Sequence, residues 1–166
     1  QWLIQTSDAP AEAYTNFLGQ GMSGVDFNLD GWDDLTVTNS AGELHFMTGG
    51  PEGWTTVDLG IEGPVDGRPM SLMWLDIDND GDRDFIHTSA MSLFAFSPAG
   101  TKSNSQLWIN EEGTFVNRTE EWGWDVLQDR ACTGTAWNDV DLDGDLDVFV
   151  SMYAYPCDAL WESENA

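Results

Sequence analysis

Short apolar runs recur along the chain, and their residue types are typical of β-strands. The clearest are "LTVTN" (35–39), "FIHTS" (85–89) and "VFVSM" (148–152), which are rich in β-branched and aromatic residues. Another apolar run precedes each of them ("GMSGV", "MSLMWL", "TGTAWN"), and further runs follow ("GELHFMT", "SQLWINEEGTFVNRT", "DALWESENA"). This pattern predicts an all-β fold whose repeating unit has about four short antiparallel strands.

An acidic stretch separates the first two runs of every unit. The three stretches are "DFNLDGWDD" (26–34), "DIDNDGDRD" (76–84) and "DVDLDGDLD" (139–147), and all fit the pattern D-x-[DN]-x-D-G-x-x-D. Like charges this close repel one another, and a bound cation would offset that repulsion. Ca²⁺ suits the pattern because it accepts six to eight oxygen ligands in irregular geometry, whereas Mg²⁺ demands a near-ideal octahedron.

Two other calcium motifs and a metal-free turn compete with this interpretation. An EF-hand loop has a glutamate at position twelve and continues into a helix, but position twelve here is Val37, His87 or Val150, and strand-like residues follow. The nonapeptide repeat of parallel β-helices needs a G-G-x-G-x-D run, which this sequence lacks. Solvated turns of Asp, Asn and Gly are common, but they do not explain three matching frames.

The acidic stretches begin at Asp26, Asp76 and Asp139, at intervals of 50 and 63 residues. Repeats of this length with about four strands each are typical of β-propeller blades. The loops, with "FLGQGMSGVDFNLDGWDDL" (17–35) and "LWINEEGTFVNRTEEWG" (107–123), resemble the FG-GAP or VCBS repeats, best known from the calcium-binding blades of integrin α-subunits. The resemblance implies a partial propeller of about two and a half to three blades, with Ca²⁺ loops between the first and second strands.

The resemblance also implies the ligands of three Ca²⁺ sites. In the family pattern, side chains at loop positions one, three, five and nine and the backbone carbonyl at position seven hold the ion. The implied sets are Asp26, Asn28, Asp30, Asp34 and the carbonyl of Trp32; Asp76, Asp78, Asp80, Asp84 and the carbonyl of Asp82; and Asp139, Asp141, Asp143, Asp147 and the carbonyl of Asp145. Because Asn28 stands in place of an aspartate, the first site is expected to bind more weakly.

Two further loop positions, six and two, have expected structural roles. Position six is Gly31, Gly81 or Gly144, because the chain turns sharply there and a Cβ would obstruct the turn. Position two is Phe27, Ile77 or Val140. These apolar side chains are expected to point away from the ion, into the packing between blades.

Charge limits the partners and the location. The chain has 30 Asp and Glu against five Lys and Arg, a formal net charge of −25, and three Ca²⁺ ions would still leave −19. Such a surface repels nucleic acid and anionic membranes, so both are excluded as partners. No stretch is long and apolar enough to span a bilayer. Because extracellular calcium modules work at millimolar calcium, a secreted or cell-surface location is expected.

The two cysteines fit an oxidising compartment. If strands pair around the third loop, Cys132 lies opposite roughly Ala154, a few residues from Cys157. This spacing permits a disulfide between Cys132 and Cys157. Two free cysteines in the core are the alternative, and neither has the spacing of a zinc site.

Tryptophan and histidine are expected to be mainly structural. Trp74 and Trp137 share a position two residues before a loop, and Trp108 and Trp161 share one in the third strand, which predicts packing between blades. Four tryptophans fall outside these positions: Trp32, Trp54, Trp122 and Trp124. They are also expected to pack, and stacking on sugar rings is the alternative. His45 and His87 have no nucleophile in their pattern, and no hydrolase, zincin or phosphate-loop motif occurs.

The expected function is that of an acidic, calcium-stabilised extracellular propeller segment with a structural, adhesive or assembly role and no catalysis. A carbohydrate-binding propeller is the alternative, and an enzyme on the same scaffold, using a carboxylate pair, is less favoured. Segment 88–105 interrupts the middle unit and is either a binding loop or a cover over the blade edge. The sequon "NRT" (117–119) is a glycan acceptor if the source is eukaryotic.

The expected blades are 17–60, 68–119 and 131–166, the last one incomplete. A closed propeller needs roughly four to eight blades. The rest of a longer chain, or further copies in a homo-oligomeric assembly, is therefore expected to complete it. Glycans are further candidate partners.

Overall fold

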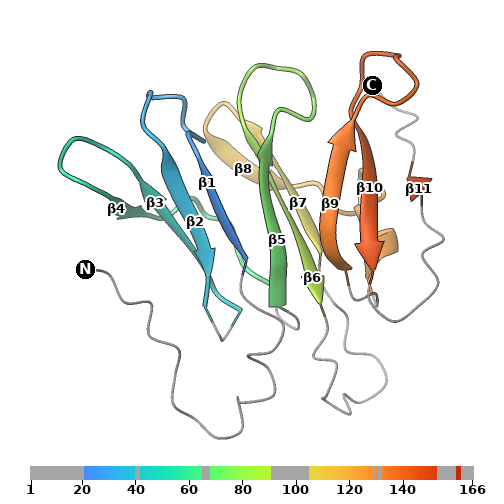
Figure 1. Cartoon of the computed structure of the whole chain (residues 1–166), viewed down its shortest axis with the longest axis horizontal. Helices are drawn as coiled ribbons and strands as arrows, with labels where there is room; N and C mark the ends of the chain where they lie inside the picture. Colours follow the sequence, from blue (N-terminus) through green and yellow to red (C-terminus); the bar gives the residue numbers. More distant parts are fainter. Residues whose placement is uncertain are drawn as a thin grey trace, which may run out of the picture.

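In the computed structural model, the described part of the chain comprises residues 21–39, 42–64, 68–90, 105–128, 130 and 132–152, together with the backbone of 160–161. Three antiparallel sheets stand side by side and fan out from one another (Figure 1). The all-β fold of a partial propeller, expected from the sequence, is confirmed. We call the three sheets blade A, blade B and blade C in chain order.

Blades A and B have four strands each, hydrogen-bonded in chain order, and the described part of blade C has three with β10 in the middle. Blade A contains β1 (Met22–Val25), β2 (Asp34–Thr38), β3 (Leu44–Thr48) and β4 (Thr55–Val57). Blade B contains β5 (Arg68–Leu75), β6 (Asp84–Ala90), β7 (Gln106–Glu111) and β8 (Thr114–Asn117). Blade C contains β9 (Cys132–Asn138), β10 (Asp147–Met152) and β11 (Leu160–Trp161), and the 3-10 helix η3 (Trp124–Leu127) precedes it.

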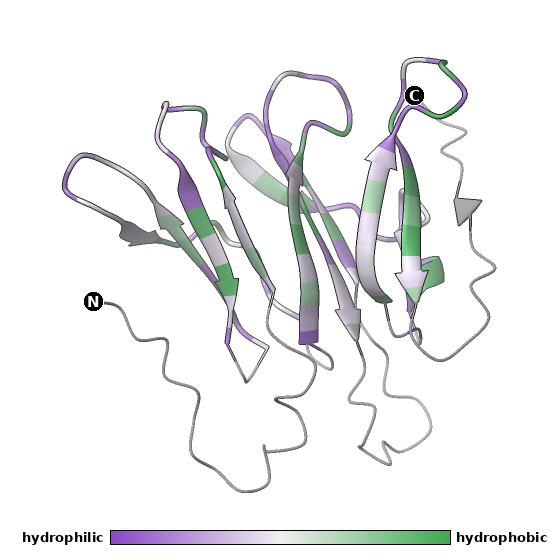
Figure 2. Cartoon of the chain, in the orientation of Figure 1, coloured by the Kyte–Doolittle hydropathy of each residue, from purple (hydrophilic) through white to green (hydrophobic). Residues whose placement is uncertain are grey.

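Each acidic stretch joins the first two strands of its blade. The pairs Val25–Asp34, Leu75–Asp84 and Asn138–Asp147 close the three loops in the same register. All three loops lie at one end of the molecule and are largely hydrophilic (Figures 1 and 2). Because every loop runs into a strand, an EF-hand is excluded here.

The expected insertion begins inside a strand. Strand β6 runs on to Ala90, so residues 88–90 belong to blade B, and Ser105 directly precedes β7. Residues 91–104 lie outside the described part of the chain. No helix in the described part of the chain has the length and apolar character that a membrane crossing needs.

The seam between blades A and B is aromatic. Trp74 is 4% exposed and stacks on Phe27 of blade A, with 4.5 Å between ring centroids. Phe46 and Phe85 pack edge-on to each other in the same cluster, 5.4 Å apart. The Trp74 indole N–H also donates a hydrogen bond of 2.9 Å to Thr36 Oγ1 across the seam. The blade-to-blade packing predicted for Trp74 is therefore confirmed.

The seam between blades B and C is mainly aliphatic. Its buried residues are Ile86, Leu107 and Ile109 of blade B, Val148, Val150 and Cys132 of blade C, and Trp124 and Leu127 of η3. Trp137 packs against this cluster and stacks on Trp124 at 5.8 Å. In β7 three consecutive residues are apolar, because successive side chains of a strand point to opposite faces: Leu107 and Ile109 lie in this seam, and Trp108 lies in the seam between blades A and B.

His87 is a buried structural histidine, as expected from the sequence. It is fully buried on β6, with its Nε2 3.0 Å from Gln106 Oε1 and its Nδ1 3.2 Å from Ser89 Oγ. Burial lowers the pKa of His87 to about 4, because the charged imidazolium would lose its hydration there. His87 is therefore neutral in the folded protein at neutral pH.

This burial predicts an acid-induced loss of stability. The unfolded state binds a proton at His87 below about pH 6.5, but the folded state does so only near pH 4. The contribution is therefore complete above pH 6.5 and falls as the pH drops towards 4, by on the order of 3 kcal/mol. We expect a His87→Gln variant to lose less free energy of unfolding than the wild type over this range, in chemical denaturation with excess chelator. Parallel pH profiles would contradict this assignment.

Candidate metal centres

The three acidic loops, which we call loop 1 (26–34), loop 2 (76–84) and loop 3 (139–147), share one backbone conformation at their turns. Glycine at position six has a positive φ in every loop: 93° at Gly31, 100° at Gly81 and 104° at Gly144. Position four is also left-handed, with φ of 59° at Leu29, 61° at Asn79 and 66° at Leu142. Leucine seldom adopts this conformation, so the surrounding loop, rather than the residue itself, imposes it.

Position one anchors the turn in all three loops. Both carboxylate oxygens of Asp26 accept hydrogen bonds, from the backbone N–H groups of Asp30 (3.1 Å) and Gly31 (2.8 Å). Asp76 accepts the same pair from positions five and six of its loop, each at 3.1 Å. Asp139 does so in the third loop, also at 3.1 Å. The turn is thereby wrapped around the first carboxylate.

Position five is turned towards the backbone. Oδ1 of Asp30 accepts the N–H of Trp32 at 2.9 Å. In the other two loops, Asp80 and Asp143 accept the N–H of position seven at 3.0 Å each. These side chains are ligands in the family pattern, and their role as ligands stays a prediction, as does that of the position-seven carbonyls.

Position nine joins the loop to the sheet. Asp84 is fully buried, and its two oxygens accept the N–H groups of Ile77 (2.8 Å) and of Asn110 in β7 (2.9 Å). Asp34 likewise accepts the N–H groups of Phe27 (2.9 Å) and Gly49 (2.7 Å). Asp147 accepts the N–H of Val140 at 2.8 Å. In blades A and B the position-nine carboxylate therefore links the loop to the third strand of the blade, at the end of β3 in blade A and in β7 in blade B.

Glycine 49 is required by this link in blade A. A Cβ built on Gly49 would lie 2.2 Å from the carbonyl oxygen of Asp33, far inside contact distance. The end of β3 therefore approaches loop 1 more closely than any side chain would allow. Sequence reasoning missed this residue, since it follows a strand and belongs to no motif.

Two loops bring three carboxylates together. Asp76, Asp78 and Asp84 each place an oxygen within 4.8 Å of the others, and Asp139, Asp141 and Asp147 do the same. These are positions one, three and nine, so the acidic clusters of loops 2 and 3 are geometrically able to hold a metal ion. In loop 1, the position-three residue Asn28 donates its side-chain amide to Asp30 at 3.1 Å.

The clustered carboxylates are electrostatically uncompensated. Burial and the neighbouring carboxylate of Asp80 raise the pKa of Asp78. Desolvation likewise raises the pKa of Asp141; the charge of Asp143 adds to this effect, whereas the hydrogen bond from its backbone N–H opposes it. Burial raises the pKa of Asp84 to about 6, although the two hydrogen bonds that its carboxylate accepts lower it. A divalent cation would reverse these shifts, because it favours the charged carboxylates.

Asp82 was expected to contribute only its carbonyl, but its side chain also lies at the cluster. Its Oδ1 is buried and has no hydrogen-bond partner among the described residues. Burial and the carboxylate of Asp80 raise the pKa of Asp82. Loop 2 thus holds one more uncompensated oxygen than the motif implies.

The prediction for position two holds in two loops and is wrong in the third. Phe27 is 4% exposed in the seam between blades A and B, and Ile77 packs against the seam between blades B and C. Val140 was expected to be packed in the same way, but it is 73% exposed. Valine is apolar enough to pack at position two, but no further blade covers Val140 in the described part of the chain.

The tryptophans outside the repeated positions divide into two groups. Trp124 is 2% exposed and belongs to the core, so sugar stacking on it is ruled out in this structure, and Trp122 is partly buried against the same cluster. Trp32 and Trp54 are 49% and 52% exposed, so the expectation that they pack is wrong. The Trp54 indole donates a hydrogen bond of 3.2 Å to the carbonyl of Asp33, which places it beside loop 1.

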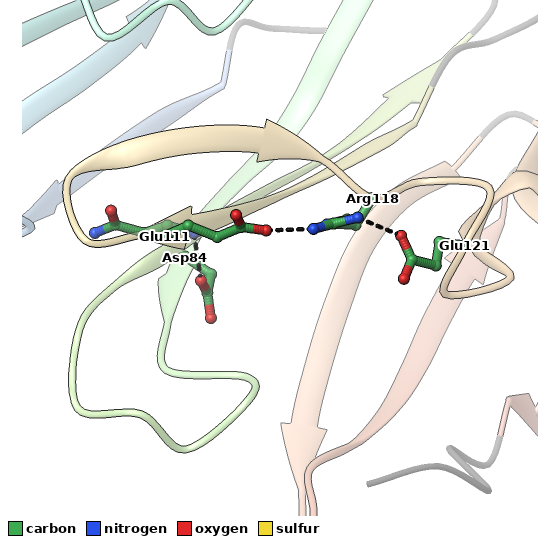
Figure 3. A network of polar contacts seen from close by, with 5 residues as sticks. Asp84, Glu111, Arg118 and Glu121 are labelled. Carbon is green, nitrogen blue, oxygen red and sulfur yellow. Dashed lines mark hydrogen bonds and ion pairs between the residues drawn. The ribbon is translucent and has the colours of Figure 1, made fainter.

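An ion pair fastens the last hairpin of blade B. Arg118 binds Glu111 of β7 and Glu121, the latter at 2.6 Å, and lies between them (Figure 3). Asp84 lies near the same hairpin (Figure 3). Exposed pairs of this kind add little stability, so we assign Arg118 to positioning the turn that precedes η3.

The predicted disulfide remains to be tested. Cys132 is a buried free thiol in this structure, and Cys157 lies outside the described residues. If the bond forms, alkylation followed by intact-mass measurement labels no cysteine before reduction and two after it. Two labelled cysteines in the unreduced, denatured protein would contradict the bond.

Comparison with known proteins agrees with the loop motif. The family model of the FG-GAP-like repeat matches residues 26–87, from the first residue of loop 1 to β6. The resemblance inferred from the acidic loops is thereby confirmed for this segment. No curated protein matches the chain.

Proposed function

We propose that this chain, which carries an FG-GAP-like repeat over residues 26–87, is a calcium-stabilised extracellular β-propeller segment. Its role is structural, adhesive or in assembly, and it is not catalytic. Three Ca²⁺ ions bind at the loops that begin at Asp26, Asp76 and Asp139. In this proposal the ions hold together the end of the molecule at which all three loops lie.

The observation that carries the proposal is the convergence of uncompensated carboxylates in loops of identical conformation. Asp76, Asp78 and Asp84 each place a carboxylate oxygen within 4.8 Å of the others. Burial raises the pKa of Asp84 to about 6. Without a cation, folding forces these charges together at a cost in free energy. A bound ion offsets that cost, since opposite charge favours the ionised carboxylates.

Calcium fits these loops better than magnesium. The oxygen donors come from a backbone turn and from carboxylates already engaged by N–H groups, so the donor set is irregular. Ca²⁺ tolerates such irregular geometry and takes six to eight oxygens, whereas Mg²⁺ keeps several waters. Modules with weak calcium sites are saturated by extracellular calcium, which supports a secreted or surface location.

Exchange of the position-three residues between two loops tests the metal assignment. Asp78→Asn keeps an oxygen acceptor but removes one charge, which gives loop 2 the same predicted ligand side chains as loop 1. We expect calcium affinity at that site to fall by at least about tenfold, or ~1.4 kcal/mol. The free energy of unfolding in chelator should be unchanged or higher, because repulsion on Asp78 is relieved.

The reciprocal variant Asn28→Asp is the matched partner. It should strengthen calcium binding at loop 1 and lower stability in chelator. Isothermal titration calorimetry measures the affinities, and denaturation in chelator measures the apo stability. Equal effects of either variant with and without calcium would contradict metal binding at these loops.

A carbohydrate-binding propeller is a second candidate, favoured by two exposed tryptophans, Trp32 in loop 1 and Trp54 beside it. Trp32 and Trp54 expose about half of their surface, and aromatic faces stack on the apolar faces of sugar rings. We expect glycan-array binding, if present, to be lost in Trp32→Ala and Trp54→Ala and kept in Arg118→Ala. An array without binding by the calcium-loaded protein would remove this candidate.

A further inference from the structure

Loop 2 is held from the side by the β7–β8 hairpin of its own blade, at the end of the molecule where the loops lie (Figure 1). The residue that makes this contact is Asn110, which is 8% exposed near the end of β7. It belongs to no motif, since it follows the apolar run of β7 and lies 26 residues after Asp84. Its role therefore has to be read from its contacts.

Asn110 makes hydrogen bonds with three different groups. Its backbone N–H donates to Asp84 Oδ1 at 2.9 Å. Its side-chain amide donates to the backbone carbonyl of Arg83 at 3.3 Å, and its Oδ1 accepts the N–H of Gly113 at 2.8 Å. Asparagine suits this position because its side chain offers a donor and an acceptor at once. One end of the amide thus holds loop 2, and the other end holds the hairpin turn.

The carbonyl that Asn110 holds lies between two predicted ligands of loop 2. Arg83 is position eight, and it is flanked by the carbonyl of Asp82 at position seven and the carboxylate of Asp84 at position nine. The hydrogen bond fixes the peptide group between Arg83 and Asp84, so it restricts rotation of the backbone that carries both ligands. The Asn110 side chain therefore bears on the geometry of the site, although it occupies no ligand position itself.

The hairpin turn gives the Asn110 side chain a firm support. Glu112 and Gly113 both have positive φ, 54° and 88°, as in the two-residue type I′ turn whose twist matches that of the flanking strands. Glu111 and Thr114 pair on either side of this turn. Because the N–H of Gly113 binds Asn110 Oδ1, the amide is anchored on a tight turn.

Blade A holds the same two groups of loop 1 with different donors. The position-eight carbonyl of Asp33 accepts the indole N–H of Trp54 at 3.2 Å. At position nine, Asp34 Oδ1 accepts the backbone N–H of Gly49 at 2.7 Å. Both donors lie between β3 and β4, in the hairpin that corresponds to β7–β8. Two unrelated side chains thus bind the same carbonyl, which indicates that the loop itself requires this bond.

We propose that Asn110 is a positioning residue for the cation of loop 2. By holding the Arg83 carbonyl, its side chain sets the directions of the Asp82 carbonyl and the Asp84 carboxylate. The inference rests on the proposed function, because it needs a cation at this loop. Hydrogen bonds to the groups around metal ligands typically change metal affinity by about 10–100-fold. We expect the larger effect at loop 2, since Asn110 is buried, whereas Trp54 is 52% exposed and water replaces its bond more easily.

Calcium titration of the ¹⁵N-labelled full chain, followed by NMR, reads each loop separately. The position-six glycines donate their N–H groups to the position-one carboxylates, so a cation bound there shifts the resonances of Gly31, Gly81 and Gly144. We expect one dissociation constant per loop in the wild type. Asn110→Ala should raise the constant read at Gly81 by at least about tenfold and leave the other two unchanged.

Asn117→Ala is the matched control, because it is the same substitution in the same hairpin and also leaves the charge unchanged. Asn117 in β8 accepts the N–H of Thr119 at 3.1 Å, away from loop 2. It should leave all three dissociation constants unchanged. An equal loss in Asn117→Ala, or a loss at all three loops in Asn110→Ala, would mean general loosening of the fold and would overturn the positioning role.

Hydrogen exchange on the wild type tests the same coupling without a variant. The Gly113 N–H is released when the Asn110 side chain turns away, and this movement also breaks the bond to Arg83. Because coupling between two equilibria is reciprocal, calcium should slow exchange at Gly113 by the factor that Asn110→Ala costs in affinity. The Thr119 N–H, held by Asn117, should not slow. Exchange at Gly113 that is the same with and without calcium contradicts the proposal.

Failure of this inference is distinct from failure of the calcium assignment. If calcium leaves the Gly81 resonance of the wild type unchanged, loop 2 binds no calcium and both proposals are overturned. If Gly81 titrates in the wild type and has the same dissociation constant in Asn110→Ala, the calcium assignment stands and the positioning role alone is overturned.

Discussion

Excess chelator is expected to lower the melting temperature of this protein markedly. A ligand present at about ten times its dissociation constant stabilises the folded state by roughly 1.4 kcal/mol per site, so three sites contribute about 4 kcal/mol. For a domain of this size, 1 kcal/mol shifts the melting temperature by about 2–4 °C, which gives a shift on the order of 10 °C. The physical reason is that the folded chain gathers carboxylates at Asp76, Asp78 and Asp84 that repel one another without a cation.

Differential scanning calorimetry with and without chelator measures this shift. Readdition of Ca²⁺ should restore the melting temperature, and readdition of the same concentration of Mg²⁺ should restore less of it. Asp33→Asn is the matched control, because Asp33 is an exposed aspartate at position eight of loop 1 and lies outside the ligand positions. It should leave the chelator-induced shift unchanged. A melting curve that chelator does not move would defeat the calcium assignment at all three loops.

Replacement of Trp74 by alanine is expected to destabilise the chain by about 3–5 kcal/mol, as for other buried large aromatics. Trp74 is 4% exposed, stacks on Phe27 at 4.5 Å and contacts Phe85 at 4.8 Å. Its removal leaves a cavity between two sheets and an unpaired hydroxyl at Thr36, which loses its hydrogen bond from the indole. Marginally stable domains have only about 5–15 kcal/mol in reserve, so the variant should unfold at much lower denaturant concentration.

Trp54→Ala provides the comparison, since the same side chain is removed from a position that is 52% exposed. We expect a loss of less than about 1 kcal/mol there, close to the range of ordinary surface substitutions. Trp74→Phe should fall between the two, because it keeps the stacking but loses the hydrogen bond. Urea denaturation of all three variants in calcium measures the differences. A Trp74→Ala variant as stable as Trp54→Ala would mean that blades A and B do not pack through this residue.

The repeat and its turns were predictable because they depend on local chemistry. Runs rich in β-branched and aromatic residues predict strands, and the glycine after the third ligand position predicts the turn at Gly31, Gly81 and Gly144. The position of Trp74 two residues before a loop predicted its burial between blades. In each case the residues that decide the structure are neighbours in sequence.

The parts that the sequence did not predict depend on residues far apart in the chain. Val140 matches Phe27 in its loop position, but no blade covers it in the part of the chain that the structure describes. Asp84 looks like one more ligand of its motif, but its contact with Asn110 in β7 makes it a buried link as well. Trp54 and Trp124 are both tryptophans outside the repeated positions, and only packing made one exposed and the other buried.

The sequence by itself therefore determined the strands and the three acidic loops, because spacing, residue type and turn chemistry act within a few residues. The tertiary structure decided which faces of the blades are covered, which carboxylates meet within 4.8 Å and which aromatic side chains reach solvent. These properties depend on the neighbour that each face acquires when the chain folds. Two equivalent residues can therefore have opposite environments, as Phe27 and Val140 do at position two of their loops.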